Sequence, residues 1–269
     1  MLFGFHSAKR PSSSCSPEVL RVEFLIGFVI AVIIALTGVG AGTITAPLLI
    51  LFLHVPGSIA VGTALGYATI VKLFIAPAQI FRKQVNYRVL GYMLLGGGPG
   101  AFLGSLLFRR VAFNTAVLYW ILGTIIVLSS LVQIAGPFLR RRAGTGRKNR
   151  LGLISMLMFP IGTEVGLSSS GAGALGTVAL LNFTDLPAHE LVGTDILFGL
   201  CVAFIGSGVH FAYGAYSAPL LIKLVAGGIA GAIAGVAIAP LLPNKQLRFA
   251  LACWLFCIGT DFCLRAASL

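Results

Sequence analysis

The sequence predicts an all-α polytopic membrane protein of two four-segment repeats, in which the first segment of each repeat is broken or re-entrant at a glycine-rich motif. Three observations predict this fold class. Of the 269 residues, 58% are hydrophobic and 10% are charged, whereas soluble domains carry about 25% charged residues. Apolar segments long enough to cross a bilayer recur along the chain. The chain also matches itself at one fixed offset, which indicates an internal repeat.

The internal repeat has an offset of 131 residues. Without a gap, Gly40-Ala41-Gly42 aligns with Gly171-Ala172-Gly173, and Val61-Gly62-Thr63 aligns with Val192-Gly193-Thr194. Single glycine matches mean little in a chain with 34 glycines, but this offset holds from Leu36 to Gly104. We therefore expect a mobile N-terminal tail over 1–18, a first membrane repeat over 19–138, a basic cytoplasmic linker over 139–150 and a second membrane repeat over 151–269.

Each repeat contains four apolar segments. They cover 22–53, 57–81, 89–108 and 113–138 in the first repeat, and 151–183, 187–212, 216–242 and 247–265 in the second. The first segment of each repeat is too long for one span, since a helix from Phe24 to Leu53 would measure about 45 Å against a hydrocarbon core of about 30 Å. Glycines lie near its middle. The segment is therefore either one tilted span with an unwound centre or a re-entrant hairpin.

The choice between these two geometries decides the symmetry of the repeats. Four spans per repeat give parallel repeats, and three spans with a hairpin give inverted repeats, which are common in transporters. Inverted repeats place most basic residues in the cytoplasm, as the positive-inside rule requires: Arg82, Lys83, Arg88, the linker, Lys245 and Arg248. Their cost is that Lys9, Arg10 and Arg21 lie outside. We favour inverted repeats with both termini outside, and parallel repeats remain the alternative.

The broken segments predict a binding site for a small anion. A helix that starts inside the membrane presents unpaired N–H groups and the positive end of its dipole, and unwound backbone is tolerated there only around a cavity or inside the protein. The candidate substrate-binding residues are glycines and neutral hydroxyl donors: Gly38, Gly40, Gly42, Thr43, Thr63, Ser168, Ser169, Ser170, Gly171, Gly173 and Thr194. The alternative is that these glycines only allow close helix packing, with the hydroxyls bonded to their own backbone.

Four ionisable residues fall inside predicted spans: Lys72, Glu164, Asp195 and His210. Such residues are costly in lipid and usually face a cavity or one another. We expect them to couple transport to protons or to compensate the charge of the anion, since His210 can change charge near physiological pH. The alternative is that they form polar pairs that stabilise helix packing.

Several other functions are excluded or disfavoured. The net charge of +12 lies mostly in short loops, which indicates a cytoplasmic anchor facing anionic lipid rather than nucleic-acid binding. Cys253 and Cys257 share a helix face but no histidine accompanies them at metal-ligand spacing, so we expect buried thiols, no metal and no cofactor. The chain lacks the Gly-x-Ser-x-Gly and His-Glu-x-x-His motifs of enzymes and the Walker motif of ATPases. We therefore expect neither an enzyme nor direct use of ATP.

Two stretches of the chain resemble the sulfite exporter TauE/SafE family. They are GVGAGTITAPLLILFLHVPGSIAVGTAL, residues 38–65, and GLSSSGAGALGTVALLNFTDLPAHELVGTDI, residues 166–196. His210 and Gly214 also fit a later His-x-x-x-Gly element, and the resemblance covers nearly the whole chain after the tail. The sequence departs from the family pattern at Ala41 and Ala172, in the middle of a Gly-Gly-Gly core, and at Gln79, where a histidine is often found.

The resemblance implies a secondary transporter in the cell inner membrane that exports small sulfur-containing oxyanions, with or without proton coupling. Its substrates would be sulfite and sulfonates such as sulfoacetate or taurine-derived anions. The expected partners are the anion and the lipid bilayer, and the sequence leaves open whether the protein forms a homodimer. The alternative function is an anion or ion channel with a glycine-rich re-entrant filter.

Overall fold

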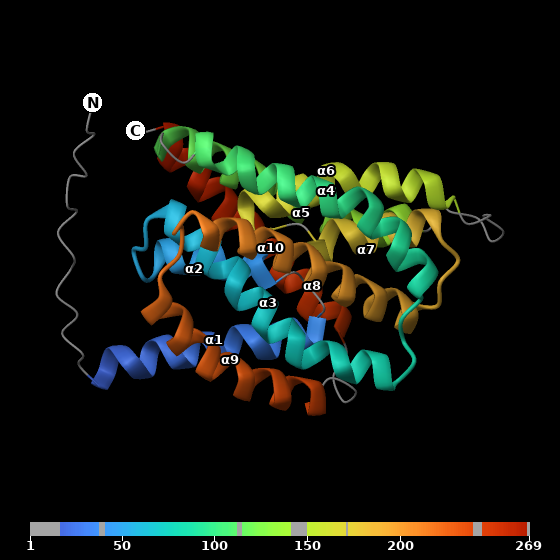
Figure 1. Cartoon of the computed structure of the whole chain (residues 1–269), viewed down its shortest axis with the longest axis horizontal. Coiled ribbons are helices and arrows are strands. Elements are labelled where there is room, and N and C mark those ends of the chain that lie inside the picture. Colours follow the sequence, from blue (N-terminus) through green and yellow to red (C-terminus); the bar gives the residue numbers. More distant parts are fainter. Residues whose placement is uncertain are drawn as a thin grey trace.

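The computed structural model describes residues 17–37, 41–111, 115–140, 150–170, 172–238 and 244–267. Within these ranges the chain forms ten α-helices and no strand (Figure 1). Their bounds are α1 Pro17–Thr37, α2 Ala41–Leu51, α3 Gly57–Phe81, α4 Tyr87–Val111, α5 Thr115–Arg140, α6 Leu151–Ser168, α7 Ala172–Phe183, α8 Ala188–Ala212, α9 Ala218–Ile238 and α10 Asn244–Ala267. Seven of these helices are long and apolar enough to cross a membrane. The predicted class, an all-α membrane protein, is confirmed.

Corresponding helices of the two halves begin at positions 131 residues apart. This holds for α2 and α7, for α3 and α8, and for α4 and α9. α3 and α8 each follow a proline in extended conformation, Pro56 and Pro187. Proline has a fixed φ and no N–H group, so it favours the position just before or at the start of a helix. Local sequence therefore determines where these helices begin.

The first segment of each half consists of two helices that fold back as a hairpin. The Arg150 N–H donates to the Phe183 carbonyl at 3.3 Å, which places the start of α6 beside the end of α7. α1 and α2 follow the same course in Figure 1, where α1 begins and α2 ends on the same side of the molecule. α2 has 11 residues, so it is about 16 Å long and reaches about half the depth of a hydrocarbon core.

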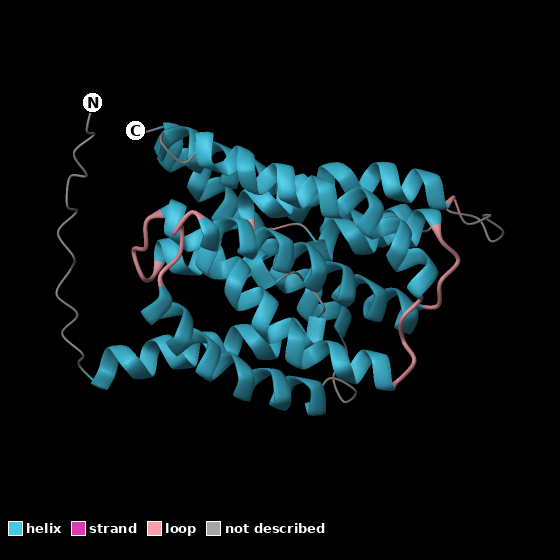
Figure 2. Ribbon diagram, in the orientation of Figure 1, coloured by secondary structure: helices cyan, strands magenta, loops and turns pink. Residues whose placement is uncertain are grey.

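The long helices α3 and α8 run in opposite directions. The Thr63 hydroxyl accepts a hydrogen bond from Ser217 N at 3.0 Å, which brings the start of α3 to the turn after α8. The Thr194 hydroxyl accepts from Asn86 N at 2.9 Å, which brings the start of α8 to the turn after α3. Figure 2 shows the connecting loops gathered at two opposite ends. We name the end with turns 52–56 and 213–217 the His54 face, and the end with turns 82–86 and 184–187 the Arg82 face.

The hairpins pack against helices of the opposite half. α1 packs on α9, and α6 packs on α4. A Cβ atom on Gly231 of α9 would lie 2.2 Å from the Phe28 carbonyl oxygen, and one on Gly100 of α4 would lie 2.2 Å from that of Phe159. These glycines therefore permit direct backbone contact between helices, as small residues commonly do in membrane proteins. Inverted repeats would produce this exchange, but the inversion itself stays a prediction.

Candidate functional site

The tips of the two hairpins meet inside the protein at Gly42 and Ser169. Gly42 lies in the first turn of α2, and Ser169 is the residue that ends α6. A Cβ atom on Gly42 would lie 1.6 Å from the Ser169 carbonyl oxygen and 1.9 Å from its hydroxyl oxygen. Only glycine leaves room for this approach. Two segments that are far apart in the sequence therefore form one site.

The chain turns at the second tip through its serine side chains. Ser169 has a left-handed conformation, with φ of 65°, and its N–H still donates to the Val165 carbonyl at 2.8 Å. The Ser168 hydroxyl donates to the Glu164 carbonyl at 2.9 Å and accepts from Ser170 N at 3.1 Å. This local bonding ends α6 at the serines and directs the chain into α7.

Three buried hydroxyl groups at the hairpin tips have no hydrogen-bond partner within the part of the chain that the structure describes. They belong to Thr43, Ser169 and Ser170, whose residues are 0%, 5% and 1% exposed. An unsatisfied buried polar group costs about 1–3 kcal/mol, so three in one place are unusual. Such donors are what a bound oxyanion would require.

Two half-length helices start next to the residues in contact, Gly42 and Ser169. α2 begins at Ala41 and α7 at Ala172, immediately after the two breaks. The first N–H groups of each helix lack carbonyl partners within the helix and carry partial positive charge. Gly173 lies in the first turn of α7, where its carbonyl accepts from the Thr177 hydroxyl at 2.7 Å. Three predicted site residues, Gly38, Gly40 and Gly171, lie outside the described residues.

A narrow cavity, named here the inner cavity, adjoins the serines. It is too narrow to hold a water molecule. Its walls combine two hydroxyl residues with apolar side chains: Ser168, Ser170, Ala46, Pro47, Ile50, Leu122, Ile126 and Phe262. The site is therefore closed in this conformation, and a ligand would have to enlarge it.

Thr63 and Thr194 lie toward the two faces, next to the turns that their hydroxyls bind. The Thr63 hydroxyl donates to the Ile59 carbonyl at 2.8 Å while it accepts from Ser217 N. The Thr194 hydroxyl accepts from Asn86 N, in the turn on the opposite face. The structure thus gives both residues a role in holding turns, and it does not bring them into the cluster formed by Thr43, Ser169 and Ser170.

Lys72 and Asp195 form a buried charged group between α3, α7 and α8. They are 3% and 2% exposed, and their side chains interact electrostatically. The Thr177 hydroxyl of α7 donates to Asp195 Oδ2 at 2.8 Å. Buried charges require such pairing because desolvation is expensive. Thr177 is not among the site residues predicted from the sequence, although its position just after the second glycine-rich break could have indicated it.

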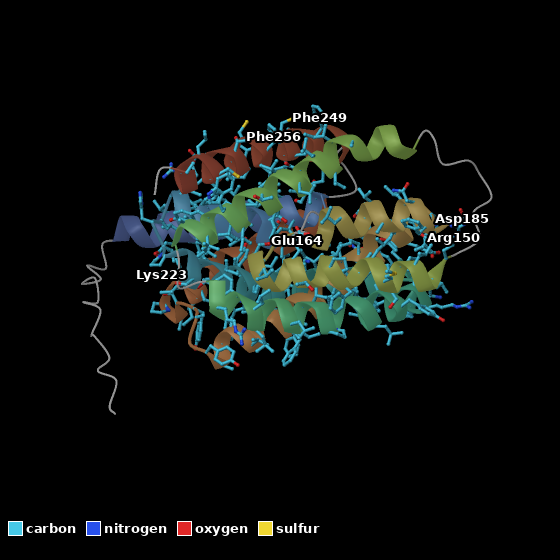
Figure 3. All side chains as sticks on the ribbon, turned by 90° about the horizontal axis from the view of Figure 1, so that it is seen from above. Arg150, Glu164, Asp185, Lys223, Phe249 and Phe256 are labelled. Atoms are coloured by element: carbon cyan, nitrogen blue, oxygen red, sulfur yellow. The ribbon has the colours of Figure 1, made fainter. Side chains whose placement is uncertain are left out.

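Glu164 belongs to the last turns of α6, and His210 of α8 contacts the same part of that helix. The His210 ring nitrogen Nε2 lies 3.1 Å from the Gly166 carbonyl oxygen, and its ring packs edge-on against Phe108. Glu164 Oε1 is buried and has no hydrogen-bond partner among the described residues. Figure 3 shows Glu164 near the middle of the helix bundle, far from both ends. A carboxylate at this depth is a candidate for binding a proton.

Comparison with known proteins agrees with this architecture. The family model described as Sulfite exporter TauE/SafE matches residues 23–262. The Probable membrane transporter protein YjnA of Bacillus subtilis (strain 168) is 29% identical over 238 residues, which cover 85% of this chain and 93% of the relative. A Probable membrane transporter protein of Haemophilus influenzae is 30% identical over 233 residues, which cover 81% and 84% of the two chains. No solved structure matches the chain.

The family match covers nearly all the described helices, including both hairpins and the site where their tips meet. The matched regions cover 93% and 84% of two relatives that are both named as probable membrane transporter proteins. The chain is therefore a multi-pass membrane transporter and belongs to the sulfite exporter TauE/SafE family, as the two glycine-rich motifs predicted.

Proposed function

We propose that this protein is a secondary transporter that exports small sulfur-containing oxyanions, such as sulfite and sulfonates, across the cell inner membrane. The observation that carries the proposal is the group of buried hydroxyls on Thr43, Ser169 and Ser170, which have no hydrogen-bond partner among the described residues and lie where the two hairpin tips meet. The substrate class follows from the family description and from the chemistry of these donors.

The donors at the hairpin tips are suited to an oxyanion that must be released again. Sulfite and sulfonate groups present several oxygen acceptors around one sulfur, and hydroxyl and backbone N–H groups can surround them. Hydrogen bonds to a charged acceptor contribute about 1.5–3 kcal/mol each. Because these donors are neutral, they bind the anion without the strong desolvated ion pair that would slow its release.

The opposed hairpins support a carrier that exposes the site to one face at a time. One hairpin has its ends at the His54 face and the other at the Arg82 face, and α3 and α8 run in opposite directions. Inverted repeats of this kind can exchange conformations, which opens the site alternately to each side. This motion would also explain why the inner cavity is closed in the present conformation.

The basic residues support an orientation with the Arg82 face in the cytoplasm. Arg82, Lys83 and Arg150 are exposed there. Figure 3 shows Arg150 and Lys223 at opposite ends of the molecule. Cytoplasmic loops carry an excess of lysine and arginine, so the ends of α1 and α10 at the His54 face would lie outside.

Proteoliposome flux tests the proposal directly. Purified protein should give saturable uptake of sulfite and sulfoacetate, with acceleration by unlabelled sulfite on the opposite side, as a carrier requires. Acetate serves as a control anion that lacks sulfur. Absence of flux for every sulfur oxyanion would overturn the proposal, and unitary sulfite currents in planar bilayers would favour the channel instead.

A further inference from the structure

A second, larger cavity opens on the His54 face. We name it the His54 vestibule, and it is lined by Ile50, Leu51, His54, Val55, Pro56, Tyr119, Phe262 and Arg265. Its three side chains with polar donors come from separate elements: His54 from the α2–α3 turn, Tyr119 from α5 and Arg265 from α10. Apolar walls with a few convergent polar groups are typical of small-ligand sites.

Phe262 lies between the vestibule and the inner cavity. Both cavities are lined by Ile50 and Phe262, while Ser168 and Ser170 line only the inner one. Phe262 is 0% exposed, and its ring packs against Tyr119 with centroids 5.5 Å apart. The phenyl ring therefore belongs to the wall that separates the two cavities, together with Ile50.

The vestibule combines hydrogen-bond donors with a cation. Arg265 Nε pairs with Asp261 at 2.7 Å, and its side chain is 58% exposed. A guanidinium has five N–H donors and readily binds oxyanions. His54 has a positive φ of 51°, a left-handed conformation in which the α2–α3 turn places it at the mouth. Asp261 offsets the charge of Arg265, but the other guanidinium N–H groups can still donate to an anion together with His54 and Tyr119.

We propose that the His54 vestibule is a second oxyanion site and that Phe262 is the gate between it and the hydroxyls at the hairpin tips. The proposal rests on the proposed function, because it gives the anion its route between the central site and the His54 face. In the described conformation the gate is closed. Passage requires the Phe262 ring to turn or α10 to move away from α2.

Variants that change the size of residue 262 test the gate. Phe262→Ala should raise sulfite flux through proteoliposomes several-fold, and Phe262→Trp should lower it. Leu131→Ala, which shortens an exposed apolar side chain of α5 outside both cavities, is the control and should not change the flux. Parent-like flux in both Phe262 variants, with an active parent, would overturn the gate.

Charge-removing variants test the vestibule as an anion site. Arg265→Ala should lower flux at subsaturating sulfite several-fold at low ionic strength, and added salt should reduce the difference, because exposed charges are screened beyond about 10 Å at 0.1 M. Arg265→Lys should keep most of the flux. Arg110→Ala removes another exposed cation outside the vestibule and should have little effect. Equal losses for Arg265→Ala and Arg110→Ala would overturn the site.

A labelling experiment separates failure of the gate from failure of the proposed function. In a variant without native cysteines, Ser170→Cys should react slowly with a negatively charged methanethiosulfonate added at the His54 face. Adding Phe262→Ala should accelerate the reaction several-fold, and adding Leu131→Ala should not. This readout does not require sulfite transport. If the parent protein does not transport sulfite but Phe262→Ala accelerates labelling, the gate stands and only the substrate assignment is wrong. Unchanged labelling would overturn the gate.

Discussion

Gly42 of α2 and Ser169 at the end of α6 are in direct backbone contact, with 1.6 Å between a Cβ at Gly42 and the Ser169 carbonyl oxygen. These residues come from different hairpins and lie at their tips. Any side chain at residue 42 would push the tips apart, so this contact links the shape of the central site to a single glycine. A substitution at residue 42 should therefore change both the stability of the protein and its affinity for sulfite.

Gly42→Ala should therefore destabilise the protein and weaken sulfite binding. Overpacking of a closely packed region costs about 1–3 kcal/mol, and displacement of the tips would separate the donors. Gly91→Ala is the control, because a Cβ at Gly91 in α4 meets nothing within 4 Å. Thermal unfolding and sulfite affinity in detergent measure both effects. A Gly42→Ala protein as stable and as tightly binding as the parent would contradict the contact.

Removing the partnerless hydroxyls should weaken binding without loss of stability. Thr43→Val and Ser170→Ala each delete a buried group with no partner among the described residues, so the ligand-free protein should be as stable as the parent or more stable. Each deletion should weaken sulfite binding by about 1.5–3 kcal/mol, the contribution of a hydrogen bond to a charged acceptor. Calorimetric titration with sulfite measures the change.

Ser105→Ala is the matched control for these hydroxyl deletions. Its hydroxyl is also buried but already donates to the Ala101 carbonyl at 2.8 Å, so sulfite affinity should remain unchanged. If Thr43→Val and Ser170→Ala bind sulfite like this control, the anion binds elsewhere.

Thr63→Val and Thr194→Val should lower stability by similar amounts. Each leaves one backbone N–H, that of Ser217 or Asn86, without the hydroxyl that it binds. The expected loss is about 0.5–1.5 kcal/mol for each hydrogen bond, and sulfite affinity should change little. Thr→Ser variants at both positions keep the hydroxyl and should retain most of the stability. A large loss of affinity with unchanged stability would instead support the sequence-based prediction that these threonines bind substrate.

Lys72 and Asp195 should show strong energetic coupling. Removing one partner of a buried ion pair typically costs about 3–5 kcal/mol because the other charge stays buried. The Lys72→Ala/Asp195→Ala double variant should therefore lose less stability than the sum of the losses in the two single variants. The corresponding positions of the opposite half are occupied by Ala203 and Ala64, so the backbone tolerates alanine there. A double-mutant cycle of thermal unfolding with additive effects would show that the two charges act independently.

Proton coupling predicts that one ionisable residue makes sulfite flux depend on an imposed pH gradient. The residues to neutralise are Glu164, Asp195 and His210, by Glu164→Gln, Asp195→Asn and His210→Gln. Protonation of the responsible residue changes the charge of the site during the cycle, so its neutral variant should lose the pH-gradient dependence but keep sulfite–sulfite exchange. If all three variants keep the wild-type dependence, none of these residues carries the proton.

The sequence by itself determined the membrane class, the family and the position of most helix ends. Predicted segments 57–81 and 151–183 coincide with the bounds of α3 and of the α6–α7 hairpin. These features are local, because apolar content, prolines such as Pro56 and glycine-rich breaks affect only the conformation of residues close to them in the sequence. The repeat offset could be recognised for the same reason, since each copy carries its own signals.

Only the tertiary structure decided which residues meet. The hairpin tips, the turns held by Thr63 and Thr194, and the Phe262 ring between two cavities all depend on contacts between distant parts of the chain. In the sequence Phe262 is one of 19 phenylalanines and does not differ from those that face lipid. The physical reason is that apolar side chains are equally compatible with lipid and with protein in a membrane, so packing, rather than hydrophobicity, determines which of them line a site.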